Sequence, residues 1–193
     1  MILLKQEIEI EFKAMLTKEK FELLERELAF PKKPITQTNH YFDTKDFYLR
    51  HKRCSVRLRE IDEEYTFTLK QAKENHVLES NKKLAFNDSN ALLQGHYRKI
   101  DDVEETLQSV GISGGDLIYY GALKTERKHF SEGQIIYFLD KSFYNGKKDF
   151  ELEIEAPTYK LGLKVFQDIL KKYNITPSRP MTKIERFFQS MLD

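Results

Sequence analysis

Charged side chains recur at every second position in several short segments of this sequence. In the first of them, Glu9, Glu11 and Lys13 alternate with Ile10 and Phe12. A period of two is typical of a β-strand, in which residues i and i+2 lie on one face about 6.5–7 Å apart. The charged groups of each segment would therefore act together on one side of a sheet. Segments with this pattern supply Glu9 and Glu11, Arg57 and Arg59, Lys70, and Glu153 and Glu155.

These residue types suit a complex of a metal ion and a polyphosphate. Neighbouring carboxylates repel each other unless a cation lies between them, and their oxygens are the ligands that Mg²⁺ and Mn²⁺ prefer. Neighbouring guanidinium groups need an anion between them and donate in pairs to phosphate oxygens. A single strand of this kind is more often the solvated face of an antiparallel sheet. The acidic pairs, however, lie on the first and last strands and the arginines on a middle one, and this set favours a phosphate-binding site.

The elements that would position these residues can be predicted from periodicity. Alternation predicts strands over 5–13, 35–44, 54–61, 64–72, 77–84, 117–130, 134–142 and 148–156. Helical spacing predicts helices over 18–29, in two pieces over 87–110, over 159–173 and over 181–192. Asp62-Glu63 and Asn145-Gly146 are predicted hairpin turns. This order indicates an α+β fold in one domain over residues 1–193, with Gly111–Gly115 between two halves of it.

Composition narrows the class of protein. The net charge of +1, from 32 basic and 31 acidic residues, argues against a dedicated nucleic-acid binder. Charged residues make up 33% of the chain, above the usual share of about 25%, so many charges need a function. No apolar run is long enough to span a membrane or to act as a signal peptide, and Cys54 is the only cysteine. We expect a cytoplasmic protein that binds no nucleic acid and no membrane.

The ordered set of charged motifs resembles the CYTH family, also called triphosphate tunnel metalloenzymes. Its signature E-x-E-x-K is matched near the N-terminus, and the further matches follow in family order over nearly the whole chain. The resemblance implies a closed antiparallel β-barrel of about eight strands that forms a polar tunnel, with helices packed outside. The matching motifs are VRLR (Arg57, Arg59), TFTLK (Lys70), KTERK (Arg127), YFLD (Asp140), ELEIEA (Glu153, Glu155) and SRPMTK (Lys183).

The resemblance also implies a role for each matched residue. One or two ions of Mg²⁺ or Mn²⁺ would be held by Glu9, Glu11, Asp140, Glu153 and Glu155. The phosphate chain would be bound by Arg57, Arg59, Lys70, Arg127 and Lys183. Lys13 would lie near the reacting phosphoryl group, and Glu7 and Glu151 would lie at the rim or support the site residues from behind. Arg179 stays open between a site role and a surface role.

Three functions fit this set of residues. We expect metal-dependent hydrolysis of a triphosphate, whether inorganic triphosphate, thiamine triphosphate or a nucleoside triphosphate. The alternatives are cyclisation of ATP by a class IV-type adenylyl cyclase and binding of a polyphosphate or nucleotide without catalysis. The two acidic pairs favour catalysis over binding alone, because a binder needs fewer metal carboxylates. The small-molecule triphosphate and the oligomeric state stay open, with a homodimer as one candidate.

Overall fold

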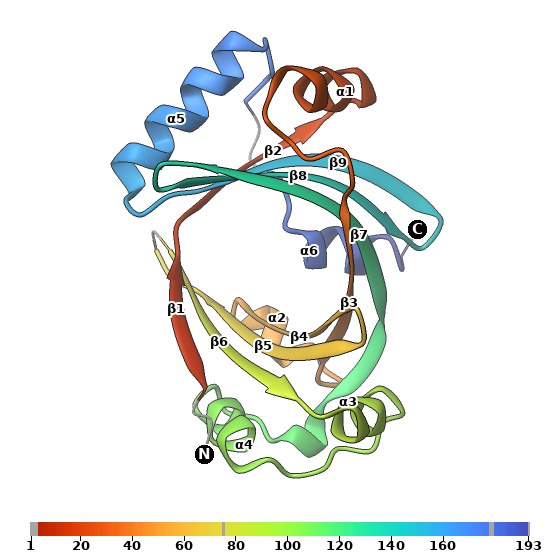
Figure 1. The fold of residues 1–193 in the computed structure, drawn as a ribbon. Helices are drawn as coiled ribbons and strands as arrows, with labels where there is room; N and C mark the ends of the chain where they lie inside the picture. Colours follow the sequence, from red (N-terminus) through yellow and green to blue (C-terminus); the bar gives the residue numbers. More distant parts are fainter. Residues whose placement is uncertain (1–3, 75, 178–179, 193) are drawn as a thin grey trace. The chain divides into compact units, whose positions relative to one another are not determined.

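The computed structural model describes residues 4–74, 76–177 and 180–192. Within them, strands and helices follow in the order shown in Figure 1. The strands are β1 Lys5–Glu9, β2 Glu11–Leu16, β3 Ile35–Asp43, β4 Cys54–Ile61, β5 Glu64–Ala72, β6 Val77–Leu84, β7 Ile118–Glu132, β8 Ile135–Tyr144 and β9 Lys147–Glu155. The helices are α1 Lys18–Glu27, α2 Tyr48–His51, α3 Phe86–Leu93, α4 Asp101–Gln108, α5 Tyr159–Lys172, α6 Lys183–Gln189 and the short 3₁₀ helix Gly114–Asp116.

The α+β fold is confirmed. Hydrogen-bonded strands form a nine-stranded sheet in the order β1-β6-β5-β4-β3-β7-β8-β9-β2, rather than a closed ring of about eight strands. The two ends of this order, β1 and β2, follow each other along the chain with only Ile10 between them. The single strand predicted over 5–13 is therefore two strands, because the backbone leaves the extended ladder at Ile10.

The chain divides into two compact units. Unit 1 comprises residues 1–8 and 37–123, and unit 2 comprises residues 9–36 and 124–193. Strand β7 contributes to both units, and the predicted boundary at Gly111–Gly115 lies inside unit 1. The predicted acidic segments and the predicted Arg57, Arg59 and Lys70 therefore belong to different units, with the acids in unit 2.

Unit 1 places apolar side chains on one face of β4 and β5 and charged ones on the other. Val56, Leu58, Phe67 and Leu69 are fully buried and pack in one core with α2, α3 and α4. The antiparallel register pairs Arg57 with Thr68 and Arg59 with Thr66, so these polar residues share the opposite face. The turn between β4 and β5 uses positive φ angles at Asp62 (48°) and Glu63 (63°), which suits a two-residue hairpin.

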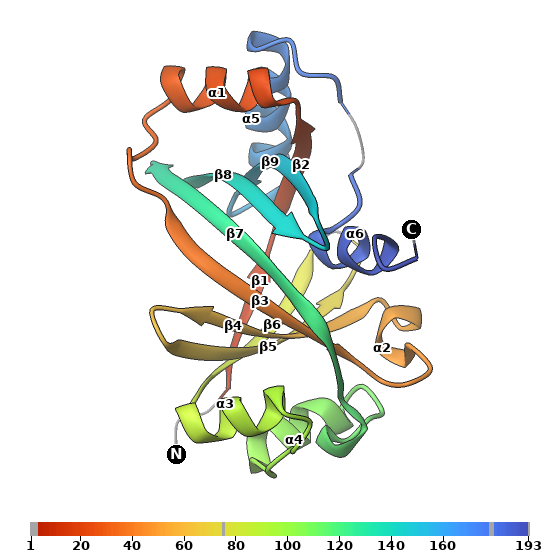
Figure 2. The ribbon, with the colours of Figure 1, turned by 90° about the vertical axis from the view of Figure 1, so that its right-hand side faces the viewer.

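Unit 2 repeats this arrangement on β2, β8 and β9. Helices α1 and α5 cover one face of these strands, and α6 lies on the other face (Figures 1 and 2). The covered face is apolar, with Ala14, Leu139, Leu152 and Ile154 fully buried in one core. Helix α5 packs so closely that a Cβ atom at Gly162 would lie 2.4 Å from the Phe12 ring. The apolar face is therefore closed by helices, and the charged face of unit 2 meets α6.

Element bounds differ from the predictions mainly at helix ends. The strands over 54–61, 64–72 and 77–84 are confirmed at both ends. Helix α1 ends at Glu27 because Leu28 leaves the helical region, with φ −107° and ψ 165°. Helix α6 begins at Lys183 because Thr182 is its N-cap. In the described part of the chain, no helix is both long enough and apolar enough to cross a membrane.

Candidate functional site

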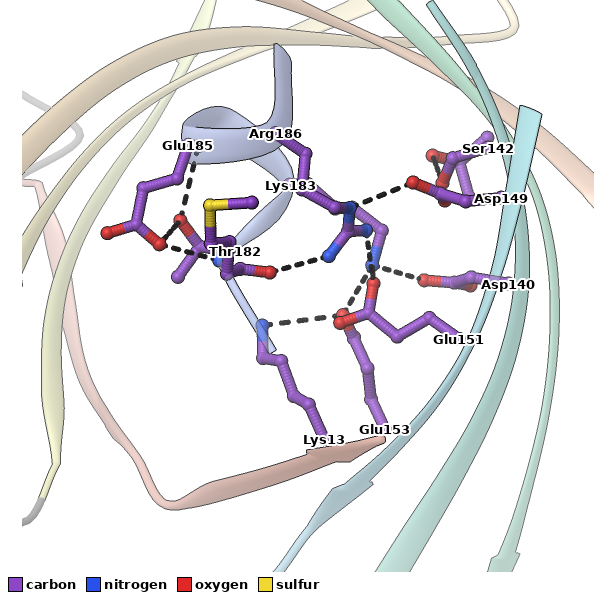
Figure 3. A network of polar contacts seen from close by, with 12 residues as sticks. Lys13, Asp140, Ser142, Asp149, Glu151, Glu153, Thr182, Lys183, Glu185 and Arg186 are labelled. Atoms are coloured by element: carbon purple, nitrogen blue, oxygen red, sulfur yellow. Dashed lines mark hydrogen bonds and ion pairs between the residues drawn. The ribbon is translucent and has the colours of Figure 1, made fainter. Parts of the chain in front are cut away.

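Unit 2 brings three buried carboxylates together on the face that meets α6. Strands β8 and β9 pair Asp140 with Glu151, and β9 and β2 pair Glu153 with Lys13. Side-chain exposure is 0% for Asp140 and Glu151 and 5% for Glu153. Figure 3 shows these side chains pointing toward one another from neighbouring strands. We call Asp140, Glu151 and Glu153 the carboxylate cluster.

Lys183, the first residue of α6, lies at the centre of the carboxylate cluster (Figure 3). Its Nζ atom lies 2.8 Å from Asp140 Oδ2, 2.7 Å from Glu151 Oε2 and 2.5 Å from Glu153 Oε1. Burial alone would lower the pKa of Lys183, but the charges of Asp140, Glu153 and Glu151 raise it above its usual value. Lys183 is therefore a fixed positive charge at this place.

Arg127 neutralises two members of the same cluster. Its Nε and Nη2 atoms donate to the two oxygens of Asp140 at 2.8 and 2.6 Å, and Nη2 also donates to Glu153 at 2.5 Å. Its guanidinium carbon lies 4.3 Å from the centre of the Phe138 ring. Burial would lower the pKa of Arg127, but Asp140 and Glu153 raise it well above its usual value. The planar fork of arginine suits this bidentate contact.

Lys13 joins the cluster from β2. Its Nζ atom lies 3.0 Å from Glu11 Oε1 and 3.4 Å from Glu153 Oε1. Although burial would lower the pKa of Lys13, Glu153 and Glu11 raise it above its usual value. The Lys13 side chain is 17% exposed, against 15% for Arg127 and 10% for Lys183, so all three are largely buried.

Acidic groups outnumber basic ones on this face of unit 2. Burial and the charges of Glu9 and Glu153 raise the pKa of Glu155 to about 7. Glu155 is also the cross-strand partner of Glu11. A divalent cation would relieve the repulsion that Glu9, Glu153 and Glu11 exert on Glu155, and carboxylate oxygens are its preferred ligands, so Glu9, Glu11 and Glu155 fit one. The described residues contain no ready-made group of three or more His, Cys, Asp or Glu that could hold a metal ion.

Unit 1 carries a second charged network, which we call the basic cluster: Arg57, Lys70 and Glu79. Glu79 on β6 is 5% exposed, forms an ion pair with Lys70, and has an oxygen 3.5 Å from Arg57 Nη2. Burial would raise the pKa of Glu79, but Arg57 and Lys70 hold it at about 2. The other Glu79 oxygen accepts from Asn81 Nδ2 at 3.2 Å. Glu79 is thus an ionised carboxylate that contacts both Arg57 and Lys70.

Two buried donors near the basic cluster have no hydrogen-bond partner: Arg57 Nε and Asn39 Nδ2. The carbonyl oxygen of Asn39 accepts from Arg59 Nε at 3.4 Å, which leaves its amide nitrogen as the unsatisfied end. A buried N–H group without an acceptor costs about 1–3 kcal/mol. Arg59 also lines a pocket of about 310 Å³ with Ile61, Asp62, Glu64 and Thr66. The unsatisfied donors Arg57 Nε and Asn39 Nδ2 favour an anionic ligand.

Five of the predicted site residues meet at the carboxylate cluster, and Arg57 and Lys70 meet at Glu79. Glu11 reaches the carboxylate cluster through Lys13, whereas Arg59 instead bonds Asn39. Of the two roles predicted for Glu151, its fully buried side chain is at odds with the rim and agrees with support of the site residues. Arg179 lies outside the described residues. The five residues that meet are Lys13, Arg127, Asp140, Glu153 and Lys183.

Sequence reasoning missed Glu79 and Arg186. Glu79 lies on the segment VLESNKKL, whose alternation is weak, although its pairing with Lys70 follows from the hairpin register. Arg186 lies three residues after Lys183, and this helical spacing could have placed both on one face of α6. Its guanidinium contacts Glu151 and Asp149, each at 2.8 Å.

Comparisons with known proteins match the fold and the motifs. The profile of the CYTH domain matches residues 7–188. The curated protein "Putative triphosphatase YjbK" of Bacillus subtilis (strain 168) is 35% identical over 187 residues, which cover 95% of this chain and 96% of that protein.

Two solved structures are similar over nearly their whole length. A "putative adenylate cyclase" from Bacillus halodurans is 35% identical, with a TM-score of 0.89 over 95% of this chain and 98% of that one. HpAC1 from Hippeastrum, described as a "putative adenylyl cyclase" with a dominant triphosphatase activity, is 20% identical with a TM-score of 0.75, over 94% and 95%. The latter similarity supports the fold alone. From the match over residues 7–188 and the identity to YjbK, the chain belongs to the CYTH domain family.

Proposed function

We propose that this protein is a triphosphatase that hydrolyses a small-molecule triphosphate with the help of a divalent cation. The observation that carries the proposal is the buried carboxylate cluster with its cations Lys13, Arg127 and Lys183, in a member of the CYTH domain family. The 35% identity to the protein named a putative triphosphatase supports the same activity.

The basic residues would bind the phosphate chain. Arg57 has an unsatisfied buried Nε atom, and Lys70 shares its carboxylate partner Glu79. Phosphoryl transfer depends mainly on positioning and on neutralising the charge of the equatorial oxygens, which arginine and lysine can do. We assign phosphate binding to Arg57, Arg59, Lys70, Arg127 and Lys183, and contact with the reacting phosphoryl group to Lys13.

The carboxylates would hold Mg²⁺ or Mn²⁺. When bound, such an ion neutralises phosphate charge and orients or activates the attacking water. Glu9, Glu11 and Glu155 supply the mutually repelling carboxylates described above. Asp140 and Glu153 already accept from Arg127 and Lys183. If a bound phosphate accepted hydrogen bonds from Arg127 and Lys183, these residues would neutralise Asp140 and Glu153 less. The two carboxylates would then favour a divalent cation beside them.

A phosphate-release screen tests this proposal. We expect inorganic triphosphate, thiamine triphosphate or a nucleoside triphosphate to release phosphate with Mg²⁺ or Mn²⁺ and not with EDTA. Glu11→Gln and Arg57→Ala should each lower turnover by about a hundredfold or more, the order seen when an electrostatic contact to the transition state is removed. Unchanged turnover in both variants would exclude the assignment of these residues.

Cyclisation of ATP is the second candidate, because the 35% identical Bacillus halodurans structure is named a putative adenylate cyclase. In that reaction the 3′-hydroxyl of ATP replaces water as the attacking group. Chromatography of the products formed from ATP separates the two functions: we expect free phosphate and no cyclic nucleotide. Tight binding of all tested triphosphates without turnover, with either metal, would instead indicate a non-catalytic binder.

A further inference from the structure

Helix α6 is held on the charged face of unit 2 by Arg186 as well as by Lys183 (Figure 3). Arg186 Nη2 donates to Glu151 Oε2 at 2.8 Å, Nε donates to Asp149 Oδ2 at 2.8 Å, and Nη1 donates to the Met181 carbonyl at 2.6 Å. Its side chain is 8% exposed. Each of the three guanidinium nitrogens therefore has a defined acceptor.

One oxygen of Glu151 serves both basic residues of α6. Oε2 accepts from Lys183 at 2.7 Å and from Arg186 at 2.8 Å, whereas Oε1 is buried and has no hydrogen-bond partner. Burial of Glu151 is complete, so its charge is balanced by neighbouring cations and not by water. Without Arg186, Lys183 would be the remaining hydrogen-bond donor to Glu151.

Lys183 would then respond, because its ammonium group has three competing partners. An uncompensated Glu151 attracts it more strongly, at the expense of the contacts with Asp140 and Glu153. The low dielectric of a buried site makes such competition strong. A change of about 1 Å in a functional group can reduce turnover a hundredfold.

We propose that Arg186 is a positioning residue: by sharing Glu151 Oε2, it keeps the Lys183 ammonium between Asp140 and Glu153. Arg186 itself needs no contact with substrate. This inference rests on the proposed function for its kinetic readout only, since the position of the Lys183 ammonium can be observed without turnover.

The kinetic test compares the contact of Arg186 with Glu151 and its contact with Asp149. We expect Arg186→Met to lower kcat about tenfold or more with KM little changed, as for other residues that orient a functional group. Asp149→Asn, which alters the contacts of Asp149 with Arg186 and Tyr144 but none in the carboxylate cluster, should keep wild-type kcat. Arg26→Met on α1 removes an arginine whose contact is the exposed Glu27 and is the matched control. Equal losses in Asp149→Asn and Arg186→Met would show that Arg186 only anchors the helix and would overturn the proposal.

A double-mutant cycle gives the second kinetic criterion. Because Arg186 is proposed to act through Glu151, Glu151→Gln combined with Arg186→Met should be no worse than the poorer single variant. Losses that multiply would contradict the proposal. Arg186→Lys keeps the charge without the fork and should fall between wild type and Arg186→Met. If Arg186→Met does not fold, Arg186→Lys and its combination with Glu151→Gln decide by the same criterion.

A spectroscopic readout separates this inference from the proposed function. The NMR signal of the Lys183 ammonium, assigned with Lys183→Met, should be sharp in wild type and Asp149→Asn, and shifted or lost in Arg186→Met. An unchanged signal in Arg186→Met would overturn the inference even in an active enzyme. Absence of phosphate release from wild type would instead remove the proposed function and leave this measurement intact.

Discussion

A single carboxylate, Glu79, determines the environment of two basic residues in unit 1. Its pKa is about 2 in the folded protein, against a usual 4.5, because Arg57 and Lys70 outweigh its burial. A lowered carboxyl pKa stabilises the fold above pH 4.5, and this contribution is lost as the pH falls toward 2. Glu79 thus links the acid stability of unit 1 to the residues proposed to bind phosphate.

Glu79→Gln tests this link. At pH 7 we expect the variant to unfold with about 3 kcal/mol less free energy than wild type, as for a buried ion pair that loses one charge. The difference should shrink as the pH falls from 4.5 toward 2, where wild-type Glu79 becomes protonated as well. Urea unfolding at several pH values measures it. Glu64→Gln is the control, since Glu64 pairs with Lys83 in solvent. A difference that does not depend on pH would contradict the assigned ionisation.

At the scale of elements, α6 is a short helix whose start is fixed by local hydrogen bonds. The Thr182 N–H donates to Glu185 Oε2 at 2.7 Å, and the Glu185 N–H donates to Thr182 Oγ1 at 3.4 Å. This capping box orients the first turn, which carries Lys183. A helix of seven residues has little stability of its own, so the cap and the ionic contacts must hold it in place.

Thr182→Ala should therefore affect both stability and activity. Loss of an N-cap costs about 1 kcal/mol of stability. Because Thr182 directly precedes Lys183, its loss should also let Lys183 move, so kcat should fall. Thr17→Ala removes the equivalent cap of α1, where Thr17 accepts from Lys20 N at 3.3 Å. It should lower the melting temperature similarly and leave kcat unchanged. Equal activity of the two variants would show that the α6 cap has no role in the site.

Alternation along strands predicted much of the fold and part of the site. A period of two fixes the face of a side chain on its own strand, so Glu9 with Glu11 and Glu153 with Glu155 could be placed as pairs. Asp140 and Lys183 entered the predicted site only through the resemblance to the CYTH family. Alternation carries no information on where a chain bends, and the break at Ile10 was missed. Nor does it show how a helix docks on a sheet. The sharing of Glu151 Oε2 by Lys183 and Arg186 is such a tertiary contact.

At the scale of the whole molecule, a net charge of +1 conceals two networks of different character. Unit 1 holds a basic cluster with one carboxylate, and unit 2 holds a surplus of carboxylates. The contacts described above for each network join residues of one unit, so each network can be tested by itself. The cytoplasmic location and the homodimer stay predictions of the sequence.

Thermal shifts should separate the ligands of the two networks. A ligand at a hundred times its Kd adds about 2.7 kcal/mol to the free energy of unfolding, and a purely structural sheet gains nothing. With Mg²⁺ or Mn²⁺ alone, we expect the melting temperature to rise in wild type and Arg57→Ala but not in Glu155→Gln, because Glu155 belongs to the carboxylate surplus. With tripolyphosphate in EDTA, the rise should persist in Glu155→Gln and shrink in Arg57→Ala, since a metal-free anion depends on the basic residues. If both variants lost both shifts equally, the division into a metal-binding and a phosphate-binding network would be wrong, and the two substitutions would share a general effect on folding.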